Sequence, residues 1–264
     1  MNSIALGPLL LSGERFAIIA GVFVFMIGSG LLASRVSARF NLWSTVVAIG
    51  GVLAARAAHV LSHWEYFSGN PVRAFAVWQG GFSWLWVLPV VVLTSILILK
   101  TTRERWWAIA PVAASALVWI IAHQLASATE PLPPPEMTLA QLDGPPLTLS
   151  APADRPSVIN IWATWCPPCR REMPALAQAE QAHPNVRFLF VNQGEGEATV
   201  RNYLGRENLS LTHVLLDTSM ALPRHYRTTG IPVTLFIHAD GRLAKAHLGE
   251  IATEQISAEI ARLK

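Results

Sequence analysis

Four long apolar stretches fill the first half of this 264-residue chain, at residues 16–34, 43–64, 82–99 and 106–126. An α-helix rises about 1.5 Å per residue, so each stretch is long enough to cross roughly 30 Å of hydrocarbon. Buried helices of a large soluble core would not follow one another four times with links this short. The sequence therefore predicts an α-helical transmembrane bundle of about four helices over residues 1–127, with the lipid bilayer as its partner.

Basic residues cluster in the first and third links between these stretches, at Arg35, Arg39, Lys100, Arg103 and Arg105. The middle link is the longest and carries only Arg73. Because Lys and Arg accumulate on the cytoplasmic side, we expect the N-terminus, the middle link and everything after the fourth stretch to lie outside the cytoplasm. These links hold much of the positive charge, so the net charge of +3 requires no nucleic-acid partner.

The second half has the pattern of a soluble domain. Residues 128–137 are rich in proline, which predicts an extended and fairly stiff linker. From 138 to 264, β-rich runs alternate with helical runs, which predicts an α/β domain around one central sheet. We expect a helix from about Pro167 to His183, and a two-residue hairpin turn at Asp240 and Gly241 between the last two strands.

The only two cysteines, Cys166 and Cys169, lie in the segment "TWCPPCRREMP" at 164–174. A structural disulfide here would close a very short loop and would add little stability. A closed zinc site needs four ligands, and the chain has no second cysteine pair. A Cu(I) site remains an alternative, because two soft thiolate ligands can suffice.

A redox role for the pair follows from its context, since it comes after a buried strand and opens a helix. Cys166 then lies at the positive end of the helix, which favours its thiolate. Cys169, one turn further on, can attack a mixed disulfide formed on Cys166. Pro167 and Pro168 have no backbone N–H to offer the Cys166 sulfur. We therefore expect a comparatively reducing couple.

The segment "WATWCPPCRREMP" (162–174) resembles the active-site segment of membrane-anchored, extracytoplasmic thioredoxin-like proteins of the TlpA and ResA type. The resemblance covers about 138–264 and includes a second landmark, "GIPVT" at 230–234. It implies a thioredoxin fold and a cis peptide bond before Pro232, facing the disulfide. It also implies that the Ile231 backbone pairs with bound substrate. The alternative for Pro232 is an ordinary proline at a strand entry.

Glu172 matches the acidic residue that such reductases carry three positions after the second cysteine, which implies tuning or proton exchange during thiol chemistry. The alternative is a surface Glu that stabilises the first turns of its helix. General thioredoxins carry a buried Asp where this chain has Asn160, so no acid can act from that place. We expect substrate to bind beside Trp165, Pro167, Pro168 and Ile231. Arg170 and Arg171 are expected to form a solvated basic edge.

Residues 54–84 resemble a segment of prolipoprotein diacylglyceryl transferases, through Arg56, Trp64, Asn70, Pro71, Trp78, Gln79, Gly80 and Gly81. Leu85 stands where these transferases have an essential His, so we expect a degenerate, transferase-like anchor rather than a transferase. Arg56 and His59 lie within a predicted span, where a buried cation needs a partner or a water-filled pocket. A relic, a lipid-headgroup contact and a docking site are all open interpretations.

Together these features predict a multi-pass protein of the bacterial inner membrane with a periplasmic thioredoxin-like domain. The expected activity is reduction of protein disulfides, with attack by Cys166 and resolution by Cys169. The resemblance implies a transmembrane thiol reductant of the DsbD type as electron donor. The candidate substrates are apocytochrome c, other periplasmic thiol proteins and copper-site cysteines. No nucleotide-binding motif is present, so we expect no dissociable redox cofactor. The alternatives are a Cu(I)-delivery module and a residual lipid-transferring or lipid-sensing membrane domain.

Overall fold

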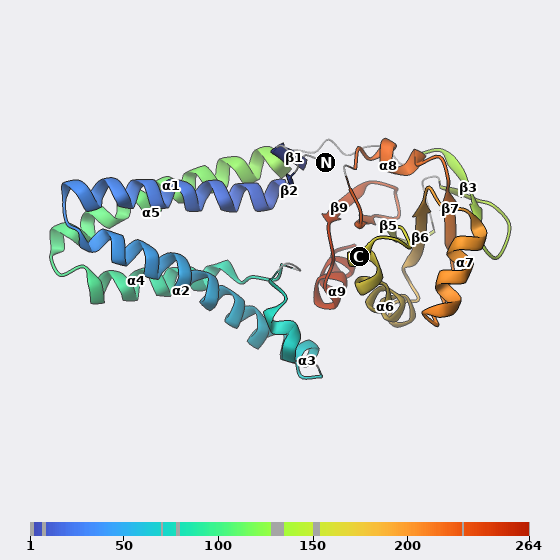
Figure 1. The fold of residues 1–264 in the computed structure, drawn as a ribbon, viewed down its shortest axis with the longest axis horizontal. Coiled ribbons are helices and arrows are strands. Elements are labelled where there is room, and N and C mark those ends of the chain that lie inside the picture. Colours follow the sequence, from blue (N-terminus) through green and yellow to red (C-terminus); the bar gives the residue numbers. More distant parts are fainter. Residues whose placement is uncertain are drawn as a thin grey trace. The chain divides into compact units, whose positions relative to one another are not determined.

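The computed structural model describes the whole chain except residues 1, 2, 7, 8, 70, 78, 79, 128–134, 150–153, 229 and 264. Two compact units are present, one built from Asn2–Val77 with Gly81–Ala128 and the other mainly from Thr129–Lys264 (Figure 1). Most of the predicted linker lies outside the described residues, as do Asn70, Trp78 and Gln79. Each unit is treated by itself below.

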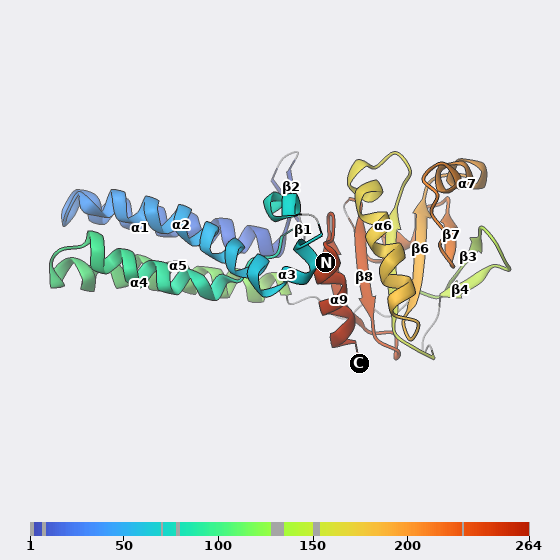
Figure 2. The same ribbon diagram turned by 90° about the horizontal axis from the view of Figure 1, so that it is seen from below.

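The first unit is a bundle of apolar helices that follows a short antiparallel pair, β1 (Ser3–Leu6) and β2 (Leu9–Ser12). Its main helices are α1 (Gly13–Arg35), α2 (Arg39–Ser62), α4 (Val87–Ile98) and α5 (Thr102–Ser127). Figures 1 and 2 show α1 lying along α5, and α2 along α4. Within the described residues, three helices are long and apolar enough to cross a membrane, in 16–35, 39–62 and 102–125.

The third predicted span is shorter than expected. Its α-helix covers only Val87–Ile98 and follows a 3-10 turn, η3 (Trp84–Trp86). Twelve helical residues rise about 18 Å, well short of the 30 Å of hydrocarbon. The helix cannot begin earlier because Gly81 has a φ of +77° and the N–H of Ser83 donates to the Ala55 carbonyl on α2. The segment between α2 and η3 includes the short helices α3 (Trp64–Phe67) and η1 (Pro71–Phe75).

Small residues allow the helix pairs to pack closely. A Cβ atom on Gly28 of α1 would lie 3.1 Å from the Pro111 Cβ on α5. A Cβ atom on Gly51 of α2 would lie 3.2 Å from Cγ1 of Val87 on α4. Close approach of backbones is the usual basis of helix association in lipid, where apolar burial gives no driving force.

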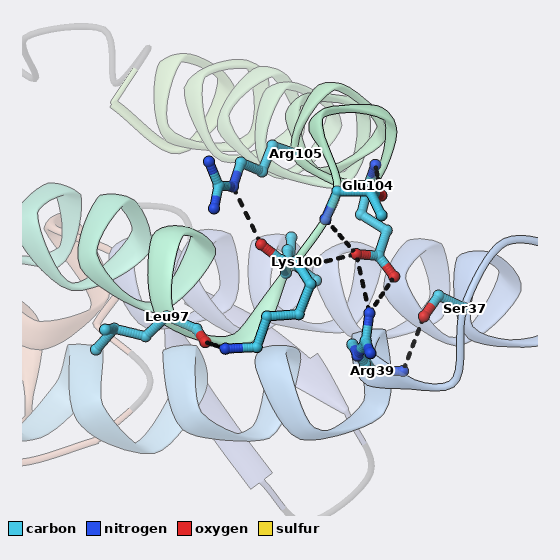
Figure 3. A network of polar contacts seen from close by, with 8 residues as sticks. Ser37, Arg39, Leu97, Lys100, Glu104 and Arg105 are labelled. Atoms are coloured by element: carbon cyan, nitrogen blue, oxygen red, sulfur yellow. Dashed lines mark hydrogen bonds and ion pairs between the residues drawn. The ribbon is translucent and has the colours of Figure 1, made fainter.

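A polar network joins the two tight turns at one end of this bundle (Figure 3). Glu104 is buried, and its carboxylate accepts from the backbone N–H groups of Lys100 (2.8 Å) and Thr101 (2.9 Å). Arg39, at the start of α2, donates to the same carboxylate at 3.3 Å. The α1–α2 and α4–α5 turns are therefore held together at the end of the bundle that carries its basic residues.

The second unit is an α/β domain around one mixed sheet. Among the described residues seven strands form it, in the order β4-β3-β7-β6-β5-β8-β9. These strands are β3 (Met137–Gln141), β4 (Leu147–Leu149), β5 (Ser157–Trp162), β6 (Arg187–Gln193), β7 (Val214–Asp217), β8 (Val233–Ile237) and β9 (Leu243–Leu248). Strands β5, β6 and β7 are parallel, and β8 and β9 continue the sheet antiparallel. This arrangement confirms the predicted α/β class.

Helices cover both faces of the sheet, which explains why β5 is buried along its whole length. They are α6 (Pro167–Ala182), α7 (Glu197–Arg206), α8 (Ala221–His225) and α9 (Thr253–Arg262). Val158 and Trp162 pack in one core with α6, α7 and α9, whereas Ile159 and Ile161 pack in the other with α8. Figure 2 shows α6 running in roughly the same direction as β6 and β8.

Two local predictions differ from the structure of this unit. The hairpin between β8 and β9 has a three-residue connection rather than two, because the N–H of His238 donates to the Arg242 carbonyl. Gly241 takes the left-handed position of this turn, with a φ of +86°. The sequence of residues 219–228 also has a helical pattern, but α8 covers only Ala221–His225, since Met220 at its start has a φ of +55°.

Candidate active site

Cys166 and Cys169 form a disulfide at the N-terminus of α6, with an S–S distance of 2.04 Å. Cys166 is the N-cap residue, and its sulfur accepts from the backbone N–H of Cys169 at 3.3 Å. Pro167 and Pro168 have no N–H, so Cys169 carries the first helix N–H that can reach this sulfur. Both cysteines are buried, at 2% and 0% exposure. The predicted position of the pair, after a buried strand and at a helix start, is confirmed.

The loop that carries Cys166 from β5 into α6 is held by Glu195, which the sequence analysis did not identify. The Glu195 carboxylate accepts from the Thr164 N–H at 2.7 Å and from the Thr164 hydroxyl at 2.6 Å. It also accepts from the side-chain amide of Asn192 at 2.7 Å. Strands β5 and β6 are parallel neighbours, and Trp162 pairs with Asn192. Their carboxyl ends therefore meet, and this is the signal that could have located Glu195.

Glu172 is buried beneath the first turns of α6, at 2% exposure. Its Oε1 accepts from the Asn160 side-chain amide at 2.8 Å, and its Oε2 accepts from the Ile251 N–H at 2.9 Å. Burial raises the pKa of this carboxyl to about 8, although both hydrogen bonds act in the opposite direction. The alternative of a surface Glu that stabilises its helix is therefore wrong.

Asn160 connects Glu172 to the centre of the sheet. It is buried on β5, and its amide also donates to the Thr234 hydroxyl on β8 at 3.1 Å. Its carbonyl oxygen has no hydrogen-bond partner among the described residues. Rotation of this amide by 180° would present that oxygen to a protonated Glu172. The site can therefore accommodate Glu172 with or without its proton.

The basic edge after the cysteines is paired with carboxylates. Arg171 forms an ion pair of 2.7 Å with Glu250, whose side chain is buried. Glu250 raises the pKa of Glu172, and Arg171 lowers it, each by a smaller amount than burial does. Arg170 binds Glu207 at 2.9 Å on the surface. Both arginines are about half exposed, in agreement with the expected solvated edge.

The peptide bond between Ile231 and Pro232 is cis, which confirms what the resemblance implied. Val233 pairs with Ile161, so Pro232 lies beside the end of β5 from which the cysteine loop starts. Pro232 is buried and Ile231 is partly buried. The substrate-contacting roles predicted for these residues stay predictions.

The remaining predicted contact residues differ in exposure. Trp165 is 66% exposed, Pro167 is exposed and Pro168 is partly buried. Trp162 is fully buried, and its ring lies 5.4 Å from that of Tyr203. Trp165 is thus available to a partner, whereas Trp162 packs in the core.

In the first unit, Arg56 is buried and its guanidinium donates to backbone carbonyls of the described residues. The acceptors are Ala74 (2.8 Å), Gly81 (3.0 Å) and Arg73 (3.0 Å). Leu85, which stands where the transferases have their His, is 81% exposed. The rings of His59 and His63 lie 4.4 Å apart. No group of three metal-binding side chains occurs among the residues that the structure describes.

Comparison with known proteins gives two family matches. The model of the family described as Redoxin matches residues 128–261, and that of Prolipoprotein diacylglyceryl transferase matches residues 7–125. The second match agrees with the membrane helices of the first unit.

Curated relatives align with the second unit. Thiol-disulfide oxidoreductase ResA of Halalkalibacterium halodurans is 32% identical over 127 residues, which cover 47% of this chain and 71% of the relative. Sporulation thiol-disulfide oxidoreductase A of Bacillus subtilis is 22% identical over 53% of this chain and 87% of its own length. The crystal structure of StoA from Bacillus subtilis aligns with a TM-score of 0.44 and 22% identity, over 49% of this chain and 99% of that one. Because the Redoxin match spans half of the chain and the ResA relative exceeds 30% identity, the chain belongs to the Redoxin family and is a thiol-disulfide oxidoreductase.

Proposed function

We propose that this protein is a membrane-anchored reductase of protein disulfides that acts outside the cytoplasm. The observation that carries the proposal is the buried Cys166–Cys169 disulfide at the start of α6, with the protonatable Glu172 one turn beyond Cys169. A structural disulfide that closes so short a loop would add little stability, so a redox role explains it better.

In the proposed reaction the reduced protein attacks first through Cys166. Its thiolate bonds to one sulfur of the substrate disulfide, and the other substrate sulfur leaves as a thiolate. Cys169 then attacks the Cys166 sulfur, which releases the second substrate thiolate and restores the Cys166–Cys169 disulfide. Two electrons pass to the substrate, which takes up two protons.

Glu172 is proposed to handle the proton of Cys169. A carboxyl with a pKa of about 8 is close to an ordinary thiol, near 8.5, so the proton can pass between them at little cost. Glu172 follows Cys169 by three residues on α6, so the two side chains share a helix face. A normally ionised carboxylate would be a much weaker base for this step.

Catalysis in the reducing direction needs a supply of electrons, because an oxidising compartment would otherwise hold the pair as a disulfide. We propose a transmembrane thiol reductant of the DsbD type as donor, with extracytoplasmic thiol proteins such as apocytochrome c as substrates. The names of the ResA and sporulation relatives, both thiol-disulfide oxidoreductases, support exchange with protein thiols.

The proposed orientation places the α1–α2 and α4–α5 turns in the cytoplasm. Figure 3 shows Arg39, Lys100 and Arg105 at these two turns, with the Arg39 guanidinium on Glu104. Since α5 would then cross from the inside to the outside, the Redoxin domain that follows it would lie in the periplasm.

The reduction potential of residues 135–264, measured by trapping free thiols in defined thiol buffers, tests the direction of electron flow. A value near −270 mV, as in thioredoxin, is expected of a dedicated reductase. A value near −120 mV would make the protein an oxidant and contradict the proposal.

The order of attack is tested with two variants. Cys169→Ser is expected to accumulate a mixed disulfide with a protein substrate through Cys166, whereas Cys166→Ser is its matched control and should trap none. Equal trapping by both variants would contradict the assigned roles. Tight, stoichiometric Cu(I) binding without any disulfide exchange would instead favour the copper-delivery alternative.

A further inference from the structure

We propose that residues 71–77 and 81–86, which lie between α3 and α4, insert into the apolar layer of the membrane and complete the short third span. This re-entrant segment has the lipid acyl chains as its partner. The inference concerns only the membrane unit and is independent of the redox function.

The register of α2 against α4 places the re-entrant segment at membrane depth. Near the basic end of the bundle, the Trp43 indole on α2 donates to the Ser95 hydroxyl on α4 at 3.1 Å. Helix α4 begins at Val87, which lies against Gly51 of α2. Helix α2 continues from Gly51 to Ser62, about 16 Å further. Over this length the partner of α2 is the re-entrant segment, since the N–H of Ser83 donates to the Ala55 carbonyl at 3.0 Å.

The depth of this contact follows from helix geometry. Ala55 lies sixteen residues along α2 from Arg39, the cation of the polar network at the basic end, which is about 24 Å. With Arg39 at the headgroups, the contact therefore lies inside a hydrocarbon layer of about 30 Å.

Arg56 supplies what an irregular backbone needs at that depth. Carbonyl groups outside a helix are costly in hydrocarbon unless another group satisfies them. The guanidinium donates to the carbonyls of Arg73, Ala74 and Gly81, which brings both described parts of the re-entrant segment onto α2. It also lies over the rings of Phe67 (5.6 Å) and Phe82 (5.8 Å). The cation that appeared to need a ligand is thus held by the segment itself.

The opposite side of η1 is apolar and open. A 3-10 helix has three residues per turn, so Val72 and Phe75 lie on the same face. They are 74% and 78% exposed, while the carbonyls of the residues between them are turned to Arg56. Such exposure of large apolar side chains would be unfavourable in water.

Lipid is the occupant that best fits this surface. The exposed face of η1 resembles that of the spans beside it, where Leu53 on α2 and Leu88 on α4 are also exposed. The surface therefore continues the lipid-facing wall of α2 and α4.

The test places single cysteines in the full oxidised chain at Val72, Phe75 or Leu85. Cys166 and Cys169 are bonded to each other, so a maleimide spin label reacts only with the new cysteine. The proteins are reconstituted into vesicles of phosphatidylethanolamine and phosphatidylglycerol. Collision of the label with oxygen, which concentrates in hydrocarbon, is compared with collision with a water-soluble nickel chelate. Leu53→Cys is the lipid control, and Asn202→Cys on the Redoxin domain is the aqueous control.

The oxygen-to-nickel ratio at Val72, Phe75 and Leu85 is expected to match that at Leu53 and to exceed that at Asn202. A ratio equal to that at Asn202 would place the segment in water and overturn the proposal. Low collision with both reagents would show that protein covers this face, which would overturn it equally. Adding Arg56→Gln to the Phe75→Cys variant should raise the collision of its label with the nickel chelate. The same substitution in the Leu53→Cys variant should leave the collision of that label with both reagents unchanged.

Discussion

Replacing Glu172 by Gln tests the consequence of burying this carboxyl. The folded protein holds Glu172 with a pKa of about 8, whereas the unfolded chain has the ordinary value of 4.5. Gln has nearly the same shape but cannot ionise. It can keep two hydrogen bonds if Asn160 turns its amide, because the Asn160 carbonyl oxygen has no partner in the described structure.

The sign and size of the effect follow from proton linkage. Between pH 4.5 and about 8 the unfolded chain loses this proton while the folded protein keeps it, so the free energy of unfolding falls as pH rises. The stability that Glu172 contributes is fully present below pH 4.5 and is lost as pH rises through about 8. Each pH unit in this window is worth about 1.4 kcal/mol. The loss is therefore about 3 kcal/mol at pH 7 and about 5 kcal/mol in full.

The assay is urea unfolding of oxidised residues 135–264 at several pH values from 4 to 9. The Glu172→Gln variant should gain stability relative to the wild type steadily from pH 4.5 to 8, and the difference should then level off. Any constant cost of the altered hydrogen bonds shifts the whole curve without changing its slope.

A matched control is Glu207→Gln, which removes a carboxyl from an exposed ion pair with Arg170. Its effect should stay below about 1 kcal/mol. A difference between the Glu172→Gln variant and wild type that does not vary from pH 4.5 to 8 would refute the reasoning.

Three further predictions concern the surroundings of the disulfide. Glu195→Ala removes the acceptor of both Thr164 hydrogen bonds, so it should lower the free energy of urea unfolding by about 1–3 kcal/mol and slow disulfide exchange. An unchanged unfolding free energy together with an unchanged exchange rate would contradict a positioning role. Arg171→Gln removes a cation that lowers the pKa of Glu172, so the pH-dependent loss of stability caused by Glu172 should extend to higher pH. A loss that ends at lower pH in the variant would be inconsistent with this electrostatic effect. Trp165→Ala changes an exposed position, so it should alter the free energy of unfolding by less than about 0.5 kcal/mol. It should slow the reduction of a protein disulfide more than the reduction of a small disulfide. Equal slowing of the two reactions would argue against a substrate contact.

Features that depend on neighbours in sequence could be predicted without the structure. The apolar lengths of α1, α2 and α5 predict membrane-spanning helices, because hydrocarbon requires about 20 apolar residues per crossing. The place of Cys166 follows from a buried strand that runs directly into an amphipathic helix. The cis bond before Pro232 followed from the resemblance, which also rests on a short motif.

Features that depend on distant residues required the tertiary structure. Glu172 could be assigned equally to the surface or to the site, because its burial depends on Asn160 from β5 and on Ile251, 79 residues away. Glu195 lies near Thr164 only because β5 and β6 are parallel neighbours.

The length of the third span also depends on tertiary contacts that the sequence does not reveal. Hydropathy alone favoured a full crossing from 82 to 99, but Arg56 binds the carbonyls of Arg73, Ala74 and Gly81 and holds the preceding backbone out of the helix. Composition and spacing by themselves determined where the long apolar helices and the thiols lie. Which polar groups are buried together was decided only by tertiary packing, since desolvation and hydrogen bonding depend on residues that are distant along the chain.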